Sequence, residues 1–330
     1  MKNIAVVCGG DSGEYEVSMN SADMVIKSMN LQKYKPFKVL IKGLNWHVLD
    51  GKKKYPMDKN DFTCTVGNKK IRFDCVYNII HGTPGEDGKI QGYLDMMGLP
   101  YTSPNVAISG LTMNKYLTKK ICQSEKLPIA KSVLIKETDP VVDIDAITKK
   151  LKLPCFVKPN NGGSSVATSK VYEKKKMIDA IEEAFKHDYE VIVEEFLKGT
   201  EVTCGVFFDG EKIKTLPITE IVPHNDFFDY DAKYNGQSDE ITPARLDKKT
   251  YQKVQKLTSE IYSLFNIQGL VRIDFIIHKN EPYFMEINTI PGFSKASIVP
   301  QQIRTAKLKE MDVITLLIEQ AMQRKKQIEK

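Results

Sequence analysis

Two neighbouring segments in the last quarter of the chain alternate between apolar and polar residues, and this alternation constrains the fold more than any other feature. Residues 270–277 have apolar side chains at every second position, namely Val271, Ile273, Phe275 and Ile277. Residues 283–288 repeat the pattern at Tyr283, Met285 and Ile287. Such alternation predicts strands with one buried face, and the turn-like residues 278–282 between them predict an antiparallel hairpin.

The polar face of this hairpin would gather four side chains that suit a metal and an anion. With a turn centred on Asn280, Asp274 lies opposite Glu286, and Arg272 lies opposite Asn288. Like charges in register destabilise a sheet, so the pattern favours a divalent cation at the two carboxylates. Carboxylate and amide oxygens are hard ligands that suit Mg²⁺ or Mn²⁺. The alternative is a solvated face with Arg272 as an ion-pair partner, and the hairpin alone does not separate the two.

Composition limits the class of protein. A chain of 330 residues is expected to form two or three domains, and 42% hydrophobic and 27% charged residues are ordinary for a globular protein. The net charge of +6 suits an anionic substrate, but the basic residues are dispersed, so we expect no nucleic-acid groove. The six cysteines form no C-x-x-C pair, and no apolar run approaches the roughly 20 residues of a membrane span. We therefore expect a cytoplasmic protein with reduced cysteines and no membrane partner.

The N-terminal third repeats one arrangement, a short strand followed by a glycine-rich loop and a helix. Residues 4–7 run into the loop 9–14, and residues 74–80 run into the loop 81–88, with helical spacing of apolar residues after each loop. This order predicts a parallel α/β sheet that binds its ligands at the loops. Turn residues follow the second helix, so the first domain is predicted to span residues 1–103.

The rest of the chain predicts two further domains, 104–194 and 195–330. The first of these would contain helices and strands, which are expected at 113–125, 130–135, 155–158, 177–185 and 190–195. The second would contain the hairpin and an amphipathic helix over 312–330. It also contains a polar, aromatic stretch without periodicity at 223–245. That loop is longer than compact domains usually carry, which is typical of an active-site lid.

Lys158 ends a predicted strand and is followed by a loop, 159–165, that suits a phosphate group. Two glycines allow a ligand to approach the backbone, and the hydroxyls of Ser164 and Ser165 add hydrogen-bond donors. The loop is neither a Walker A loop nor a dinucleotide-binding motif, so an ordinary flexible turn is the alternative. Together with Lys115 and the predicted metal site, it supplies the parts needed to hold a nucleoside triphosphate for phosphoryl transfer.

Other residues give weaker signals. His81 follows a predicted strand and is a candidate substrate contact, although a lone histidine there is more often structural. Tyr230, Lys233 and Tyr234 lie in the long loop, so their candidacy depends on its being a lid. No G-x-S-x-G element supports hydrolase chemistry.

In order and spacing, the motifs resemble the D-alanine–D-alanine ligase family of the ATP-grasp superfamily over essentially the whole chain. The segments that carry the resemblance are Gly9–Glu14 with Val17-Ser18, His81-Gly82 with Gly85–Gly88, Met113–Lys115, Val157–Pro159 with Gly163–Ser165, Tyr230–Tyr234, Arg272–Asp274, and Glu286–Thr289 with Pro291-Gly292.

The resemblance implies an ATP-grasp fold with an N-terminal parallel α/β substrate domain and α+β character in the C-terminal part. It also implies ATP-dependent joining of two D-alanines through a D-alanyl phosphate, for peptidoglycan precursor synthesis, by a cytoplasmic homodimer. Glu14 would anchor the ammonium group of the first D-alanine in a hydrogen-bond network with Ser164 and Tyr234. Ser297, with the backbone at Ile298, would hold the carboxylate of the second.

The resemblance also distributes the contacts to ATP and to two Mg²⁺ or Mn²⁺ ions. The expected phosphate ligands are Lys115, Lys158, Ser165 and Lys233. The adenine pocket and the ribose contact would be formed by Glu194, Glu195, Phe196, Leu197 and Glu201. The expected metal ligands are Asp274, Glu286 and Asn288. The groups expected to stabilise the oxyanion during transfer are Arg272 and the backbone of Gly292.

The chain departs from the family pattern at three places. Asn161-Gly162 replaces a charged Arg-Glu pair in the phosphate loop, Ala167 stands where glycine is usual, and residues 293–296 differ before Ser297. The first change removes a charge pair and should loosen the loop. The Lys233-Tyr234 pair favours the dipeptide over a D-alanine–D-lactate product. The alternatives are another ATP-grasp carboxylate–amine or D-alanine–D-lactate ligase and, from a different class, a nucleotide-binding module without catalysis.

Overall fold

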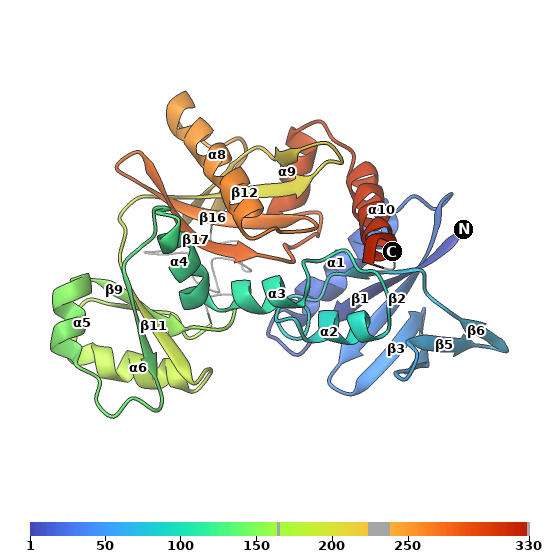
Figure 1. Ribbon diagram of the computed structural model, residues 1–330, viewed down its shortest axis with the longest axis horizontal. Helices are drawn as coiled ribbons and strands as arrows, with labels where there is room; N and C mark the ends of the chain where they lie inside the picture. Colours follow the sequence, from blue (N-terminus) through green and yellow to red (C-terminus); the bar gives the residue numbers. More distant parts are fainter. Residues whose placement is uncertain (164–165, 224–237, 329–330) are drawn as a thin grey trace.

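Figure 1 shows a computed structural model of the chain, which describes residues 1–163, 166–223 and 238–328. Three β-sheets follow one another along the chain, each covered by helices. Within the described residues, no helix combines the length and the apolar composition needed to cross a membrane.

The first sheet begins with parallel strands, as the N-terminal pattern predicts. β1 (Lys2–Gly9) pairs in parallel with β2 (Tyr34–Lys42) and β7 (Cys75–Asn78), and α1 (Tyr15–Ser28) packs against β1. β1 is buried from Ile4 onward, which explains its continuous apolar run. The sheet then continues with antiparallel strands that the sequence analysis did not predict: β3 (Asn45–Asp50), β4 (Lys53–Asp58), β5 (Thr63–Val66) and β6 (Lys69–Ile71).

The two glycine-rich loops meet at one edge of this sheet. Each loop follows the carboxyl end of a parallel strand, and the N–H of Asp11 in the first donates to the carbonyl of Thr83 in the second at 2.9 Å. The first loop requires glycine at Gly9, because φ is +98° and a side chain there would lie 2.7 Å from the carbonyl oxygen of Ile41. The second loop leads into α2 (Lys89–Met96).

The helix predicted over 113–125 is wrong at its start. Asn114 has an extended backbone, so α3 (Val106–Met113) ends before it and α4 (Lys115–Ser124) begins after it. The side chain of Asn114 accepts a hydrogen bond at 2.9 Å from the N–H three residues later, as an N-cap residue does. The candidate phosphate ligand Lys115 is therefore the first residue of a helix.

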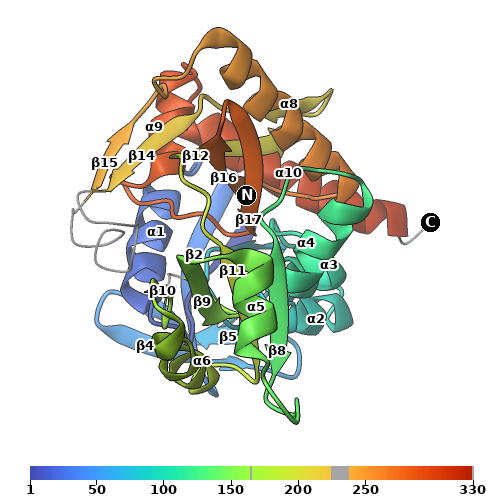
Figure 2. The same cartoon turned by 90° about the vertical axis from the view of Figure 1, so that its left-hand side faces the viewer.

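The second sheet is antiparallel and has the strand order β10–β9–β11–β8. Its strands are β8 (Ser132–Lys136), β9 (Cys155–Pro159), β10 (Ser169–Val171) and β11 (Glu190–Glu195). Helices α5 (Ile144–Leu151) and α6 (Met177–Phe185), the latter preceded by the turn η1 (Lys174–Lys176), pack on one face and complete its core (Figure 2). The strands predicted at 155–158 and 190–195 and the helix predicted at 177–185 are confirmed.

The third sheet is also antiparallel, and α8 (Lys248–Leu264) covers one face. In sheet order its strands are β15 (Ser238–Ile241), β14 (Thr219–Pro223), β12 (Thr200–Phe208), β16 (Val271–His278) and β17 (Glu281–Asn288), with β13 (Ile213–Thr215) beside β12. The loop predicted at 223–245 is wrong at both ends, because residue 223 ends β14 and residues 238–241 form β15. Residues 224–237 lie outside the described part of the chain.

The C-terminal segment returns to the first sheet. α9 (Ile298–Thr305) leads to α10 (Glu310–Ile328), and α10 contacts α1 and β7. Apolar residues of α10 share one hydrophobic core with residues of β1 and α1. Figure 1 shows this helix, in red, beside the blue N-terminal segment. The two ends of the chain therefore stabilise one another.

Candidate active site

A cavity of about 1000 Å³ is lined by segments from all three sheet regions. The predicted site residues that line it are Glu14, Lys115, Lys158, Glu194, Glu195, Phe196, Leu197, Glu201, Asp274 and Glu286. The described candidates that do not line it are His81, Arg272, Asn288, Gly292, Ser297 and Ile298. The remaining candidates lie outside the described residues; they are Ser164, Ser165, Tyr230, Lys233 and Tyr234.

The hairpin β16–β17 has the predicted register at its polar end. Asp274 pairs with Glu286, and Arg272 pairs with Asn288. The apolar residues of β16 lie on the opposite face, in the core against α8. The two carboxylates therefore come from adjacent strands on the face that lines the cavity.

The turn of the hairpin differs from the prediction. It consists of Lys279 and Asn280, both with positive φ, as in a type I′ turn. A regular hairpin with that turn would pair Asp274 with Met285. Instead the register shifts after Asp274, and Met285 is the extra residue of a β-bulge. The prediction that Met285 faces the core is therefore wrong: Met285 lines the cavity, and Phe284 is buried in the core.

Asp274 accepts hydrogen bonds from three neighbouring side chains. Arg272 donates from Nε to Oδ1 at 2.9 Å and from Nη2 to Oδ2 at 2.8 Å. Asn288 Nδ2 donates to Oδ2 at 2.8 Å, and Thr203 Oγ1 donates to Oδ1 at 2.5 Å. Only 7% of Asp274 is exposed, so this bidentate ion pair and the two hydrogen bonds supply the polar partners of a nearly buried carboxylate.

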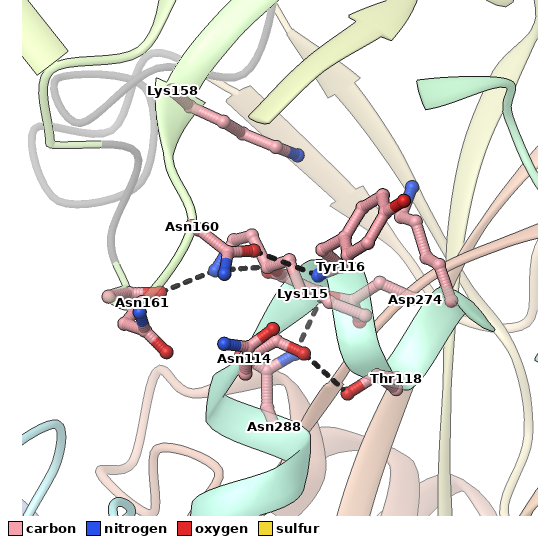
Figure 3. A network of polar contacts seen from close by, with 12 residues as sticks. Asn114, Lys115, Tyr116, Thr118, Lys158, Asn160, Asn161, Asp274 and Asn288 are labelled. Carbon is pink, nitrogen blue, oxygen red and sulfur yellow. Dashed lines mark hydrogen bonds and ion pairs between the residues drawn. The ribbon is translucent and has the colours of Figure 1, made fainter. Parts of the chain in front are cut away.

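Lys115 links the hairpin to the phosphate loop. Its Nζ lies 3.5 Å from Glu286 Oε2 and donates to the carbonyl oxygen of Gly162 at 2.5 Å. Figure 3 shows the start of α4 between the loop segment that follows Lys158 and the strand that carries Asp274. A cationic side chain is thus held between a carboxylate of the hairpin and the backbone of the loop.

The oxygen donors of the hairpin fit a hard divalent cation. Asp274 and Glu286 are paired on the cavity face, and the amide of Asn288 contacts Asp274. Two carboxylates and an amide oxygen on one hairpin are ligands that Mg²⁺ and Mn²⁺ accept, with water or phosphate oxygens completing the shell. Among the described residues, no group of three or more His, Cys, Asp and Glu side chains is arranged to hold a metal. An ion here would therefore depend on phosphate or water ligands.

Glu194 is buried between two lysines. Its Oε2 lies 2.6 Å from Lys158 Nζ, and its Oε1 contacts the Nζ of Lys119 on α4. Burial alone would raise the pKa of Glu194, but the two ammonium groups outweigh burial and lower the pKa to about 2. Burial would likewise lower the pKa of Lys158, yet Glu194 and Glu286 raise it above its usual value. The lysine expected to contact phosphate is therefore charged.

Aromatic side chains form one wall of the cavity beside Glu194. The ring centroids of Phe156 and Phe196 lie 6.0 Å apart, and Lys170 Nζ lies 4.2 Å from the centroid of the Phe196 ring. The carboxylate of Glu195 accepts a hydrogen bond at 2.8 Å from the N–H of Lys131. Flat apolar surfaces with a few polar groups at the edge suit a purine base. Leu197, Glu201 and Met285 also line the cavity.

The carboxylate of Glu14 lies where the N-terminal loops approach the phosphate loop. A side chain at Gly163 would lie 3.3 Å from Glu14 Oε2, and one at Gly82 would lie 3.7 Å from it. The two glycines therefore leave space beside the carboxylate. The partners predicted for Glu14, Ser164 and Tyr234, are outside the described residues.

His81 is buried behind the loops rather than in the cavity wall. Its Nδ1 lies 2.7 Å from the carbonyl oxygen of Ile290, and its Nε2 lies 3.3 Å from Ser21 Oγ. Burial lowers the pKa of His81, although the charge of Glu14 acts in the opposite direction. In this position His81 joins the first sheet to the segment after β17, and a direct substrate contact stays a prediction.

Gly292, Ser297 and Ile298 lie together at the start of α9. Ser297 precedes this helix, but its hydroxyl does not cap it and instead accepts a hydrogen bond at 2.9 Å from the N–H of Ser294. A side chain at Gly292 would lie only 3.0 Å from Ser297 Oγ, so glycine allows the two segments to approach. N–H groups at a helix start suit a carboxylate ligand.

Sequence reasoning missed two polar residues of this site. Lys119 follows Lys115 by four residues, which places both on the same face of a helix, so its spacing was a readable signal. Thr203 gave no such signal, because it reaches Asp274 only through the pairing of β12 with β16.

Family models cover most of the chain. A model described as the D-ala D-ala ligase N-terminus matches residues 3–104, and one described as the D-ala D-ala ligase C-terminus matches residues 121–319. A curated protein from Azobacteroides pseudotrichonymphae, named D-alanine–D-alanine ligase, is 45% identical over 322 residues, which are 97% of this chain and 99% of the relative.

Solved structures of similar fold carry related names. The D-alanine–D-alanine ligase of Coxiella burnetii has a TM-score of 0.88 and 27% identity, over 99% of this chain and 96% of that chain. The VanG D-Ala:D-Ser ligase of Enterococcus faecalis has a TM-score of 0.84 and 31% identity, over 97% and 99%. The D-alanine–D-alanine ligase of Bacillus anthracis complexed with ATP has a TM-score of 0.80 and 27% identity, over 99% and 100%.

Proposed function

This chain belongs to the D-alanine–D-alanine ligase family, and we propose that it joins two D-alanine molecules into D-alanyl-D-alanine while ATP is cleaved to ADP and phosphate. The observation that carries the proposal is the convergence of Glu14, Lys115 and Lys158 with the paired carboxylates Asp274 and Glu286 on one cavity. The antiparallel second and third sheets, which both contribute to that cavity, agree with the ATP-grasp fold of the family.

Two chemical steps require these groups. A carboxylate is a poor electrophile, so the γ-phosphoryl group of ATP is first transferred to the carboxylate of one D-alanine, giving D-alanyl phosphate and ADP. The neutral amine of the second D-alanine then attacks the carbonyl carbon, the bond to phosphate breaks, and the new amide nitrogen loses a proton. Lys115 and Lys158 balance the charge of the phosphate oxygens, and the charged state of Lys158 supports this role.

The hairpin would serve the transferred phosphoryl group. Asp274, Glu286 and Asn288 would hold Mg²⁺ or Mn²⁺, two ions in our proposal, which would neutralise phosphate charge and orient ATP. Arg272 lies on the same face, in a bidentate contact with Asp274, and would meet the oxyanion that develops on the carbonyl. The backbone N–H of Gly292 would be the second donor to that oxyanion.

The amino acid substrates would bind on the side of the N-terminal loops and of α9. Glu14 would pair with the ammonium group of the first D-alanine, with Ser164 and Tyr234 completing the network and His81 supporting the loop. Ser297 and the N–H of Ile298 would hold the carboxylate of the second, which the start of α9 favours. Lys233 and Ser165 would add phosphate contacts, and Glu194 to Leu197 with Glu201 would hold the adenosine.

The direct test is product formation by the purified protein. With ATP, Mg²⁺ and D-alanine, we expect ADP release that requires D-alanine, and one D-alanyl-D-alanine for each ADP, measured by a coupled assay and by mass spectrometry. D-serine and D-lactate as acceptors separate this activity from that of D-alanine–D-serine and depsipeptide ligases. ATP binding without turnover on any acceptor would contradict the proposal and leave a nucleotide-binding module.

Glu286→Gln tests the carboxylate pair. Removing one of two carboxylate ligands should lower kcat/KM for ATP about a hundredfold or more, because phosphate charge is then poorly neutralised. Glu281→Gln is the matched control: Glu281 is on the same strand, is exposed and pairs with Lys253, so the variant should keep wild-type rates. Full activity of Glu286→Gln over a Mg²⁺ titration would show that the metal assignment is wrong.

The assembly and location of the protein are also proposals. A homodimer follows from the family resemblance, and light scattering of the purified protein tests it. A cytoplasmic location, where the peptidoglycan precursors are made, is supported by six cysteines that are all buried and unpaired.

A further inference from the structure

The first turn of α4 is capped from two different parts of the chain. The first N–H groups of any α-helix have no partner within the helix. In α4, the N–H of Leu117 is bonded by the side chain of Asn114, which is local. The N–H groups of Lys115 and Tyr116 are both bonded by Asn160, the second residue of the phosphate loop 159–165. Its carbonyl oxygen accepts from Lys115 at 3.1 Å, and its Oδ1 accepts from Tyr116 at 2.8 Å.

Asn160 is fully buried and has no free polar group in its side chain. Its Nδ2 donates to Glu190 Oε2 at 2.7 Å, and Asn114 Nδ2 donates to the same oxygen at 3.2 Å. The backbone N–H of Asn160 donates to the carbonyl of Glu190 at 2.9 Å. The carboxylate of Glu190 therefore holds both capping asparagines by charge-assisted hydrogen bonds. Figure 3 shows Asn160 between the loop and the start of the helix.

The contacts continue on both sides of Asn160. On the loop side, the N–H and Nδ2 of Asn161 both donate to Asp188 Oδ2, at 2.6 and 3.0 Å. On the helix side, Lys115 extends back to the carbonyl of Gly162. The helix start and the loop are thus joined at the backbone, through the Asn160 amide and through the Lys115 ammonium.

We propose that Asn160 is a positioning residue for ATP, which caps α4 from the phosphate loop so that Lys115 and loop residues 159–163 approach the triphosphate as one rigid unit. The proposal rests on the proposed function, because Lys115 is there a phosphate ligand. Pre-organised donors bind a phosphate without a further ordering cost, whereas a loop and helix that move separately must be ordered by the ligand. The predicted loosening of the loop by Asn161-Gly162 is countered by this clamp.

Asn160→Ala removes the side-chain part of the clamp, which is the contacts to Tyr116 and Glu190, without changing a group that touches substrate. We expect the KM for ATP to rise about tenfold, while the KM for D-alanine changes less than about twofold. Asn105→Ala is the matched control: Asn105 caps the adjacent helix α3 by accepting from Ile108 at 3.0 Å, and its side chain makes no hydrogen bond to the described residues of the phosphate loop. It should lower thermal stability to a similar degree and leave the KM for ATP at the wild-type value.

A pair of substitutions at the clamp separates positioning from general damage. Asn160→Asp keeps the acceptor for Tyr116 but places a second carboxylate against Glu190, so it should weaken ATP binding more than alanine does. Adding Glu190→Gln to Asn160→Asp restores the hydrogen bond in the opposite direction, because the amide now at position 190 donates to the carboxylate at position 160. The double variant should recover most of the affinity for ATP. Binding of a non-hydrolysable ATP analogue, followed by calorimetry, measures this even in a variant with low turnover.

The outcomes are distinct for the two proposals. A wild-type protein that binds the ATP analogue but releases no ADP with D-alanine would refute the proposed function, while the variant affinities would still test the clamp. Equal ATP affinity in Asn160→Ala and Asn105→Ala, or a double variant that binds no better than Asn160→Asp, would overturn the positioning role. A selective loss of ATP affinity with recovery in the double variant supports it.

Discussion

At the scale of single residues, the least expected feature is a buried lysine that faces a buried glutamate. Lys119 is 1% exposed and Glu194 is 2% exposed, so the charge of Lys119 relies on Glu194, and that of Glu194 relies on Lys119 and Lys158. Burial lowers the pKa of Lys119, whereas the two lysines lower that of Glu194 to about 2. A buried pair adds little net stability, but removing one partner leaves a charge without compensation.

Lys119→Met should therefore destabilise the protein by about 3 kcal/mol, because Glu194 keeps only Lys158. The free energy of unfolding from urea titrations at neutral pH measures this. The neighbouring Lys120→Met is the control, since Lys120 is exposed, and should change stability by less than about 0.5 kcal/mol. Equal stability of the two variants would show that Lys119 is not a compensating charge.

The same pair predicts a dependence on pH. The pKa of Glu194 is lowered from 4.5 to about 2 in the folded protein, so its contribution to stability is present above pH 4.5 and is lost as the pH falls toward 2. The stability difference between wild type and Lys119→Met should shrink over this interval, because the variant has less of this contribution to lose. A constant difference from pH 5 to pH 2.5 would contradict the assignment.

At the scale of elements, the bulge in β17 decides which side chains reach the cavity. Alternation predicted that Tyr283 and Met285 share the core face with Ile287. On the turn side of Glu286, the bulge exchanges the residues on the two faces of the strand. Phe284 enters the core, Met285 lines the cavity, and Tyr283 is half-buried opposite Ile276. The predicted pairing of Asp274 with Glu286 is kept only because the two-residue turn and the extra residue offset one another.

Alanine substitutions at two adjacent residues test this register. Phe284→Ala should cost about 3–5 kcal/mol of unfolding free energy, because a fully buried ring is removed. Met285→Ala should cost less than about 1 kcal/mol and instead weaken ATP binding, since the side chain lines the cavity. Urea denaturation and the KM for ATP give the two readouts. The reverse order of stability losses would be the result expected of a regular hairpin without the bulge.

At the scale of the whole molecule, α10 closes the structure by joining its first and last parts. Arg324 donates to the carbonyl of Tyr101 at 2.5 Å and to Gln268 Oε1 at 2.7 Å, and so connects the end of the first sheet region with the segment before β16. Apolar residues of the same helix share the core of β1 and α1. The boundaries predicted near residues 103 and 194 remain proposals, and the C-terminal helix packs across the first of them.

Arg324→Ala should loosen this junction. The carbonyl of Tyr101 would lose a charged donor, so we expect a loss of about 2 kcal/mol and faster proteolysis near residues 101–105. Differential scanning calorimetry and limited digestion with chymotrypsin, which cleaves after aromatic residues such as Tyr101, measure the two effects. Arg304→Ala is the control, because Arg304 is exposed on α9 and donates to Glu310 and to the carbonyl of Lys295 instead of to Tyr101. Unchanged digestion near residue 103 in Arg324→Ala would mean that the apolar core alone holds α10.

The sequence by itself determined the local elements and the chemistry of the site. Periodicity located the hairpin, the parallel strands β1 and β7 but not β2, and the helices α1, α2, α4, α6 and α10, because the spacing of apolar residues is a local property. The order of motifs pointed to the D-alanine–D-alanine ligase family, which the family models bear out. Residue type alone identified the candidate ligands: the ammonium groups of Lys115 and Lys158 suit phosphate, and the carboxylates of Asp274 and Glu286 suit a metal ion.

Only the tertiary structure decided which side chains meet. Asn160 caps α4, Lys119 reaches Glu194, and Thr203 reaches Asp274. These contacts join residues that are 44 to 75 positions apart, so no local pattern predicts them. The bulge at Met285 reconciles the geometry of the two-residue turn with the packing of the core. The alternation of polar and apolar residues does not predict it. These partners are set by long-range packing. A buried polar group without a hydrogen-bond partner destabilises the fold wherever it lies in the chain.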